Sequence, residues 1–241
     1  DPTLDFDEED RQIDLLIMES TYGDRLHEPV QDLKPQLQKV LSETYKRGGS
    51  VIIPAFAYGR TQELLYVLHE LYNENEVPRF TVYVDSPLAT KITRVFAEHP
   101  EVYDQETHEA FLQQGKNPFQ FDQVNFVKSV EESMALNRDK TPHIVVAASG
   151  MCEAGRILHH LKNNVWREQC HLVIVGYQGV GTLGRRLVDG ADEIRLWGHE
   201  YRVRIQLHTI GGLSAHADQS DLVRWYEGFE NRPPVYLVHG E

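Results

Sequence analysis

Two histidines near the end of the chain stand where small or apolar residues give way to polar ones. His216 lies within Leu213–Asp218, and His239 follows the apolar run Val235–Val238. In α/β proteins catalytic groups collect at such positions, because the carboxyl ends of the strands open onto the ligand crevice. An imidazole there can bind a metal ion or act as a general acid. For either residue alone, the alternative is a loop histidine that only makes hydrogen bonds.

Glu19 supplies a carboxylate in a matching position. It directly follows Ile13–Met18, an apolar run that predicts a buried strand. A glutamate close to a histidine favours the imidazolium, which is the form that donates a proton. These residue types therefore indicate acid–base or metal chemistry at strand ends.

A second pattern occurs three times: a strand, a small-residue turn, and then Gly-Arg at the start of a helix. It ends at Arg60, at Arg156 and at Arg185. Helix amino termini offer unpaired N–H groups, glycines let an anion approach the backbone, and arginine adds a forked donor. Three such turns along one sheet edge predict binding of successive phosphates of a polynucleotide. The candidate phosphate-binding residues are Arg60, Ser149, Gly150, Arg156, Thr182, Gly184 and Arg185.

The alternative for each turn is that Gly-Arg simply ends a loop and the arginine pairs with a surface acid. Gly179-Val180-Gly181 does not complete the six-residue glycine spacing of a dinucleotide site. The lysine of a phosphate-binding ATPase loop is also absent from these turns. The turns therefore carry neither fingerprint.

The elements that would position these residues alternate between strands and helices. Such alternation predicts an α/β fold, with a mainly parallel β-sheet covered by helices on both faces. Strands are expected at 13–18, 50–54, 80–84, 143–147, 171–175, 193–196, 202–207 and 235–238. Helices are expected at about 30–47, 61–75, 129–137, 155–162, 182–188 and 218–229, with one more begun by Asp85-Ser86-Pro87 and a helix-then-loop stretch at 104–122.

The composition narrows the class of protein. The 241 residues, 41% of them hydrophobic, can bury a sizeable core, and the net charge of −13 argues against binding nucleic acid by bulk charge alone. Local arginines and a metal can still hold phosphates on an acidic protein. Cys152 and Cys170 are too few and too isolated for a disulfide scaffold, which favours a reducing compartment. With no signal peptide and no long apolar span, a soluble, cytoplasmic protein without a membrane partner is expected.

Three motifs resemble the β-CASP branch of the metallo-β-lactamase fold, the nucleases of RNA maturation and DNA repair. Ile17–Gly23 is similar to the family's first β-CASP motif, Leu213–Asp218 to its second and Val238–Glu241 to its third. The resemblance covers nearly the whole chain, and the motifs together are highly specific. Further segments that resemble family sequence lie around Arg60 and at Ser86–Ala89, Ser149–Met151 and Gly181–Arg185.

The resemblance implies a role for each motif residue. Glu19 and His216 would form the acid pair that protonates the leaving oxygen, and His239 would bind one of two zinc ions. A metal-held hydroxide would attack the phosphodiester in line. A histidine at the third motif goes with the RNA-processing members, the branch similar to the cleavage-and-polyadenylation endonuclease, and the bacterial and archaeal type is the nearest. The implied protein is a zinc-dependent ribonuclease whose partners are single-stranded RNA and either a second copy or other RNA-processing subunits.

The family's main metal motif, His-x-His-x-Asp-His, is absent from the chain, as are a histidine and an aspartate expected before Glu19. We expect all of them upstream of Asp1. The resemblance then implies a β-CASP domain at 24–200, flanked by metallo-β-lactamase fragments at 1–23 and 201–241. One ligand cannot hold two zinc ions, so this chain alone is expected to bind zinc weakly and to leave RNA uncut.

Two other functions compete with this one. A non-catalytic RNA-binding or scaffolding paralogue would lack the metal motif altogether, although the intact Glu19, His216 and His239 speak against it. A metallohydrolase of small phosphoesters would need no extended anion-binding edge, whereas the three glycine–arginine turns favour a long polyanion. The upstream sequence decides the first alternative, and competition between single-stranded RNA and mononucleotides decides the second.

Overall fold

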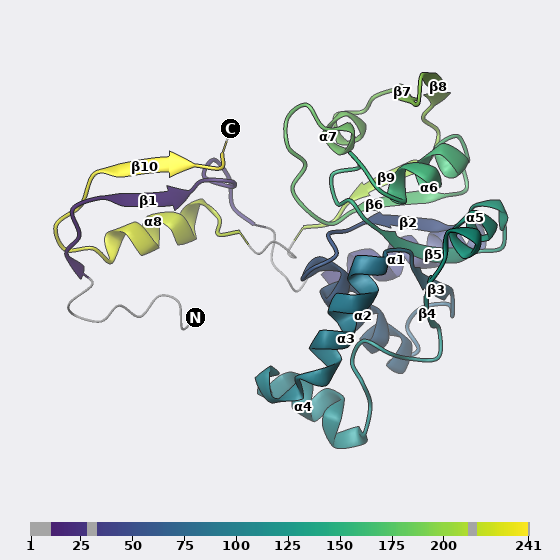
Figure 1. Ribbon diagram of the computed structural model, residues 1–241, viewed down its shortest axis with the longest axis horizontal. Coiled ribbons are helices and arrows are strands. Elements are labelled where there is room, and N and C mark those ends of the chain that lie inside the picture. Colours follow the sequence, from purple (N-terminus) through teal and green to yellow (C-terminus); the bar gives the residue numbers. More distant parts are fainter. Residues whose placement is uncertain (1–10, 28–32, 212–215, 241) are drawn as a thin grey trace. The chain divides into compact units, whose positions relative to one another are not determined.

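The computed structural model describes residues 11–27, 33–211 and 216–240. The chain forms two compact units. The terminal unit combines both ends of the chain, Asp1–Pro29 and Ser214–Glu241, and the central unit holds Val30–Leu213. In sequence, the central unit is therefore an insertion between the two halves of the terminal unit (Figure 1).

The central unit is built on a six-stranded sheet in the order β4-β3-β5-β2-β6-β9, and every neighbouring pair in it is parallel. This confirms the expected α/β fold with a mainly parallel sheet flanked by helices (Figure 1). The strands are β2 (Val51–Pro54), β3 (Thr81–Val84), β4 (Val124–Phe126), β5 (His143–Ala147), β6 (His171–Ile174) and β9 (Gln206–Thr209).

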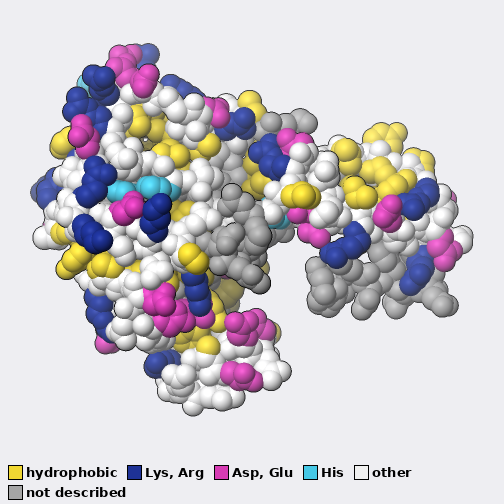
Figure 2. All heavy atoms as spheres, turned by 180° about the vertical axis from the view of Figure 1, so that it is seen from behind, with side chains coloured by type: hydrophobic (Ala, Val, Ile, Leu, Met, Phe, Trp, Pro, Cys, Tyr) yellow, Lys and Arg dark blue, Asp and Glu magenta, His cyan; other side chains and the backbone are white. Residues whose placement is uncertain are grey.

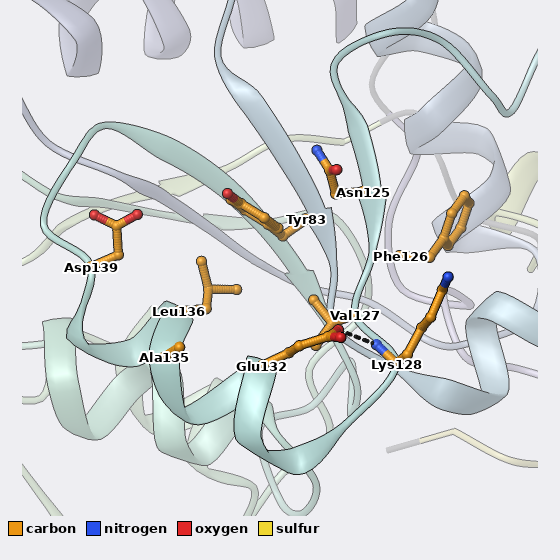
Figure 3. Close-up of a pocket in the computed structure, with 9 residues that line it drawn as sticks. All are labelled: Tyr83, Asn125, Phe126, Val127, Lys128, Glu132, Ala135, Leu136 and Asp139. Atoms are coloured by element: carbon orange, nitrogen blue, oxygen red, sulfur yellow. Dashed lines mark hydrogen bonds between the residues drawn. The ribbon is translucent and has the colours of Figure 1, made fainter.

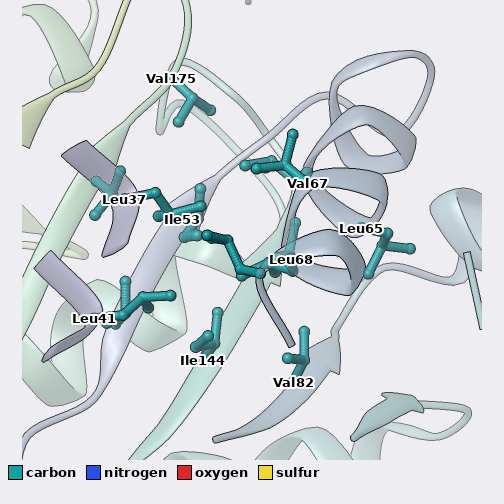
Figure 4. Close-up of a cluster of buried hydrophobic side chains, with 14 of the residues drawn as sticks. Leu37, Leu41, Ile53, Leu65, Val67, Leu68, Val82, Ile144 and Val175 are labelled. Atoms are coloured by element: carbon teal, nitrogen blue, oxygen red, sulfur yellow. The ribbon is translucent and has the colours of Figure 1, made fainter. Parts of the chain in front are cut away.

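Helices cover both faces of this sheet. Successive residues of a buried strand point to opposite sides, so Ile53 packs into a first core with α1 and α2, whereas Ile52 packs into a second core with α6 and α7. Burying each such side chain is worth roughly 1.5–3 kcal/mol. Figure 4 shows the first core, where Leu37 and Leu41 of α1 face Ile53. The α-helices are α1 (Leu33–Lys46), α2 (Arg60–Asn73), α3 (Pro87–Glu98), α4 (Gln105–Ala110), α5 (Val130–Arg138), α6 (Ile157–Asn164) and α7 (Leu183–Val188).

The chain leaves the two middle strands toward opposite faces of the sheet. After β2 it enters α2, which packs in the first core, and after the neighbouring β5 it enters α6, which packs in the second. Divergence of adjacent connections opens a crevice at the carboxyl ends of the strands, where ligands of open α/β sheets bind. The topology thus marks the ends of β2 and β5 as the place in the central unit that is suited to a ligand.

The expected strand at 202–207 is wrong. Arg202 ends β8 (His199–Arg202), which pairs with β7 (Glu193–Leu196) in an antiparallel hairpin, and the next strand begins only at Gln206. Trp197 and Gly198 form the turn, with φ of 47° and 83°. Positive φ at both turn residues is typical of the tight hairpin turn that matches the twist of the strands.

The other expected elements of the central unit are found within a few residues of their predicted bounds. Ser86 caps α3 as the sequence predicts, because its side chain accepts a hydrogen bond from the backbone N–H of Ala89. The short edge strand β4 was not expected. The stretch 104–122 contains α4 and a 3-10 helix, η5 (Leu112–Gln114), and a second 3-10 helix, η4 (Pro100–Val102), precedes it.

The terminal unit consists of two parallel strands and a helix in its described part. β1 (Leu16–Glu19) pairs with β10 (Val235–Val238), and α8 (Gln219–Glu227) lies along them (Figure 1). β10 has its predicted bounds, whereas β1 begins three residues later than the apolar run predicts and includes Glu19. The expected burial of the first strand is wrong, because only Leu16 of β1 is buried and Ile17 is exposed. The part of the second motif at 213–215 lies outside the described residues. The assignment of 1–23, 24–200 and 201–241 to family domains stays a prediction.

Among the residues that the structure describes, no helix combines the length and apolar character needed to cross a bilayer.

Candidate active site

The pairing of β1 with β10 places Glu19 and His239 side by side. Glu19 is opposite Val238 in the register, and His239 follows directly. Beyond the strands, the backbone N–H of Ser20 donates to the Val238 carbonyl at 2.9 Å. Gly240, the residue after His239, must be small, because a Cβ added there would lie 2.8 Å from the Ser20 carbonyl oxygen. The sequence expectation that these two residues sit at strand ends is confirmed.

His216 joins this pair from the segment that precedes α8. Its Nδ1 atom lies 3.2 Å from Oε2 of Glu19, and the backbone N–H of Ala217 donates to Oε1 at 3.1 Å. Asp218 holds the segment by capping α8 and by accepting the N–H of His27 at 3.0 Å. These hydrogen bonds, led by that of His27, keep the pKa of Asp218 well below its ordinary range.

Thr21 connects the two histidines and was not singled out from the sequence. Its hydroxyl donates to the carbonyl oxygen of His239 at 2.9 Å and lies 3.0 Å from Nδ1 of the same residue. The same hydroxyl lies 3.4 Å from Nδ1 of His216 and also hydrogen-bonds the Glu19 carboxylate. These contacts fix the direction of the His239 ring, as outer hydrogen bonds do for a metal-binding histidine. The only signal in the sequence is a threonine two residues after the strand-end acid Glu19.

The carboxylate of Glu19 is held in its charged form. Partial burial acts to raise its pKa, but hydrogen bonds from Thr21, the charge of His216 and the N–H of Ala217 outweigh that effect and lower it. An anionic Glu19 accepts the Nδ1 proton of His216. The opposite nitrogen, Nε2, is then the one that can pass a proton to another molecule.

The donor set of this cluster also suits a metal. Glu19, His216 and His239 can each offer one ligand atom, and these atoms all lie within 4.8 Å of one another. One carboxylate oxygen and two imidazole nitrogens are ligands that zinc takes in catalytic sites. Among the described residues, these three form the one group of at least three His, Cys, Asp or Glu side chains placed closely enough to hold a metal ion. From the sequence only His239 was expected to be a ligand, so the cluster widens that set.

The seven candidate phosphate-binding residues all lie in the central unit, after the carboxyl ends of β2, β5 and β6. Each arginine is engaged with a carboxylate. Arg60 contacts Glu63 at 2.5 Å, Arg156 contacts the buried Asp85 at 2.5 Å, and Arg185 contacts Asp189 at 2.9 Å. For Arg60 and Arg185 this is the pairing with a surface acid that the sequence left open as the alternative, whereas the partner of Arg156 is buried. Phosphate binding by these residues stays a prediction.

The turns after β5 and β6 interlock. The N–H of Gly184 donates to Met151 at 3.0 Å, and Gln178 donates to the carbonyl of Gly150 at 3.0 Å. The hydroxyls of Ser149 and Thr182 serve the turns themselves. The Ser149 hydroxyl accepts a hydrogen bond from the N–H of Glu153, and the Thr182 hydroxyl caps α7. The two turns therefore form one rigid surface at the edge of the sheet.

Asp85 organises the start of α6 and was not recognised from the sequence as a buried charge. It is fully buried at the end of β3 and accepts hydrogen bonds from Ser133, Arg156 and His160. Burial acts to raise its pKa, but these three partners, His160 first, lower it. Arg156 is thereby fixed at the helix start.

A cavity of about 480 Å³ lies between α5 and the β3–β4 edge of the same sheet. Glu132 lines it and accepts the backbone N–H of Lys128 at 2.8 Å, the dashed contact in Figure 3. None of the residues predicted to do chemistry lines this cavity.

A parallel α/β sheet is inserted between two strands whose ends carry Glu19 and His239, with His216 joining them from the segment before α8, and this is the arrangement of a β-CASP nuclease. The chain belongs to this family of metallo-β-lactamase-fold nucleases. The family model of the Beta-Casp domain matches residues 61–187. A second model, the Zn-dependent metallo-hydrolase RNA specificity domain, matches 200–241.

Individual relatives agree with the family. Ribonuclease TTHA0252 of Thermus thermophilus is 41% identical over 228 residues, which cover 95% of this chain and 52% of that protein. The transcription termination factor FttA of a Lokiarchaeum species is 35% identical over 239 residues, covering 95% of this chain and 37% of that protein. FttA of Methanosarcina mazei is 31% identical over 238 residues, with the same coverage. The chain thus spans about half the length of the first relative and just over a third of the others.

Proposed function

We propose that this chain is the RNA-clamping and general-acid portion of a zinc-dependent ribonuclease that acts in RNA processing or decay. The observation that carries the proposal is the cluster formed by Glu19 and His239, at the ends of β1 and β10, with His216, which precedes α8. The relative named a ribonuclease and the family model described by RNA specificity support RNA as the substrate.

In this proposal His216 is the proton donor. Its Nδ1 faces the carboxylate of Glu19, which stabilises a positive imidazole and fixes the direction of the ring. Nε2 then delivers the proton to the oxygen that leaves as the phosphodiester is cleaved. Glu19 keeps its negative charge throughout, because its hydrogen bonds hold its pKa low.

His239 offers Nε2 as a metal ligand, with Thr21 fixing Nδ1. Because Glu19 and His216 serve as the acid pair in this proposal, His239 is the zinc ligand that it assigns, and we propose two ions in the complete protein. Bound zinc would supply positive charge beside the phosphate and would lower the pKa of a water molecule that it holds. One ligand cannot hold two ions, so we expect the isolated chain to bind zinc weakly and to leave RNA intact.

We further propose that the turns after β2, β5 and β6 hold the RNA backbone, through the seven residues named above. Arginine presents five N–H donors in a planar fork that suits phosphate. Basic and acidic side chains are interspersed on the face shown in Figure 2. Binding would accordingly depend on a few placed donors rather than on a basic surface, in line with the net charge of −13.

The relatives named transcription termination factors favour a second candidate, an RNA-directed role in termination that the same site could serve. A scaffolding paralogue and a hydrolase of small phosphoesters remain the weaker alternatives. Buried free Cys152 and Cys170 support the expected cytoplasmic location. A second copy or other RNA-processing subunits stay the expected partners.

Cleavage of labelled single-stranded RNA tests the proposal. The complete protein should cut RNA with zinc, and His239→Ala should abolish cutting and weaken zinc binding, whereas His199→Ala, an exposed histidine of the β7–β8 hairpin, should leave both unchanged. The isolated chain should bind RNA without cutting it. Zinc-independent cutting by the complete protein, or efficient cutting by the chain alone that His239→Ala removes, would contradict the proposal.

A further inference from the structure

Two exposed aromatic side chains follow the carboxyl end of β2. Phe56 and Tyr58, in the turn after β2, are 48% and 72% exposed, although both lie between a fully buried strand and a helix that packs in the first core. Exposed apolar side chains that gather on a surface mark interaction sites. Their position at the divergence of the two connections adds a reason from topology.

The Phe56 ring packs against Gly150 of the neighbouring turn. A Cβ added at Gly150 would be 2.8 Å and 2.9 Å from two carbons of the Phe56 ring, so only glycine allows this approach. Gly150 is one of the residues predicted to contact phosphate. The phenyl ring and a predicted backbone anion site are therefore in direct contact.

The turn that carries Phe56 is held in place before any ligand arrives. The carbonyl oxygen of Phe56 accepts a hydrogen bond from the hydroxyl of Thr61 at 2.8 Å. The carbonyl oxygen of Ala57 accepts one from the side-chain amide of Gln62 at 3.2 Å. Gly59 completes the turn with a φ of 73°, a conformation that glycine adopts without strain. A fixed ring loses little entropy when another ring stacks on it.

We infer that Phe56 is a base-stacking residue, and that it takes an unpaired nucleobase of RNA whose phosphates contact the adjoining turns. Every base has a π-face, and single-strand binding proteins pair such aromatic platforms with donors to the backbone. Paired bases are closed off within their stack, so the site selects single-stranded RNA. This inference rests on the proposed function, because it requires that the central unit binds RNA.

An aromatic side chain could instead dock a partner protein, as aromatic residues dominate protein interfaces. The donors in the adjoining turns favour RNA. With one base stacked, loss of the ring should weaken binding by about 1–3 kcal/mol, or roughly 5- to 150-fold in Kd.

Fluorescence anisotropy of a labelled single-stranded RNA with the 241-residue chain tests the inference. Phe56→Ala should raise Kd at least fivefold without changing the salt dependence, since the variant keeps every donor to phosphate. Phe56→Trp should restore the affinity, and its added fluorescence should be quenched by RNA. The matched control is Trp197→Ala, which removes a ring that is 53% exposed on the β7–β8 turn and should leave Kd unchanged.

The outcomes separate the two claims. If the unaltered chain binds RNA and Phe56→Ala binds within twofold of it, the stacking inference is wrong and the proposed function stands. If the unaltered chain binds no RNA, the RNA-clamping part of the proposed function fails first. If Phe56→Ala does not fold, the absence of RNA quenching in Phe56→Trp contradicts the inference instead.

Discussion

Nδ1 of His216 lies 3.2 Å from Oε2 of Glu19, although 197 positions separate the two residues in the sequence. The carboxylate ends β1, and the histidine precedes α8. Two short hydrogen-bonded segments of one compact unit therefore bring together an acid and a base that could pass a proton.

The charge state of Glu19 depends on Thr21. Thr21→Val removes the hydroxyl and should raise the pKa of Glu19 toward its ordinary value, because the hydrogen bonds of Thr21 are the strongest of the effects that lower it. Carboxyl-carbon NMR titration of the metal-free chain measures this. Ser20→Ala is the control, since its hydroxyl bonds the Val238 carbonyl and not Glu19. An unchanged Glu19 titration in Thr21→Val would contradict the assignment.

Asp85 should be the most sensitive acid of the central unit. Asp85→Asn leaves Arg156 and His160 without their buried counter-charge, and we expect a loss of about 3 kcal/mol in the free energy of unfolding. Glu63→Gln, which removes the half-exposed partner of Arg60, should cost less than about 1 kcal/mol. Urea unfolding of both variants makes the comparison. Equal losses of unfolding free energy in the two variants would show that the burial of Asp85 and its partners adds little to stability.

Stability should fall in mild acid because of His143. Burial lowers the pKa of this histidine to about 4. Between about pH 6.5 and 4 the unfolded chain binds a proton there and the folded chain does not, so stability is full above that window and is lost as pH falls through it. The contribution is at most roughly 3 kcal/mol. His143→Gln should make the pH dependence of urea unfolding less steep, and the part due to His171, whose pKa burial also lowers to about 4, should remain. His199→Gln should leave the dependence as steep as before.

The three turn arginines should each contribute to RNA binding. Arg60→Ala and Arg185→Ala should weaken binding and lower the salt slope by about one unit for each phosphate that the variant no longer binds. Arg156→Ala should also destabilise the fold, because it frees Asp85. Arg204→Ala, an exposed arginine paired with Glu168, is the control. Unchanged affinity in all three variants would remove the phosphate-binding role.

Much of the fold follows from the sequence, because apolar runs mark strands. Val235–Val238 is a strand with the predicted bounds, although its side chains are mostly exposed, and the alternation of strands and helices predicts the parallel sheet. The hairpin at Trp197-Gly198 was missed because a tryptophan with positive φ is rare and gives no turn signal. The edge strand β4 was missed because three residues carry no readable period.

The candidate site likewise contains residues that the sequence identifies and residues that it does not. Residue type and strand-end position identify Glu19 and His239, and His216 is found by its small neighbours and the helix cap that follows it; the fold then brings the three together. Thr21 and Asp85 act through side-chain contacts across the chain, and no local pattern predicts such contacts. The partners of the three arginines are likewise a matter of packing, so the sequence left their pairing open.

The account depends most on His216 as the proton donor, and the dependence of cleavage on the leaving group tests this most directly. In the complete protein, His216→Ala should slow RNA cleavage by about 10²- to 10⁴-fold. The same variant should slow hydrolysis of bis(p-nitrophenyl) phosphate far less, because nitrophenolate leaves without a proton. Equal losses on both substrates would contradict the account and would indicate that His216 acts as a metal ligand instead.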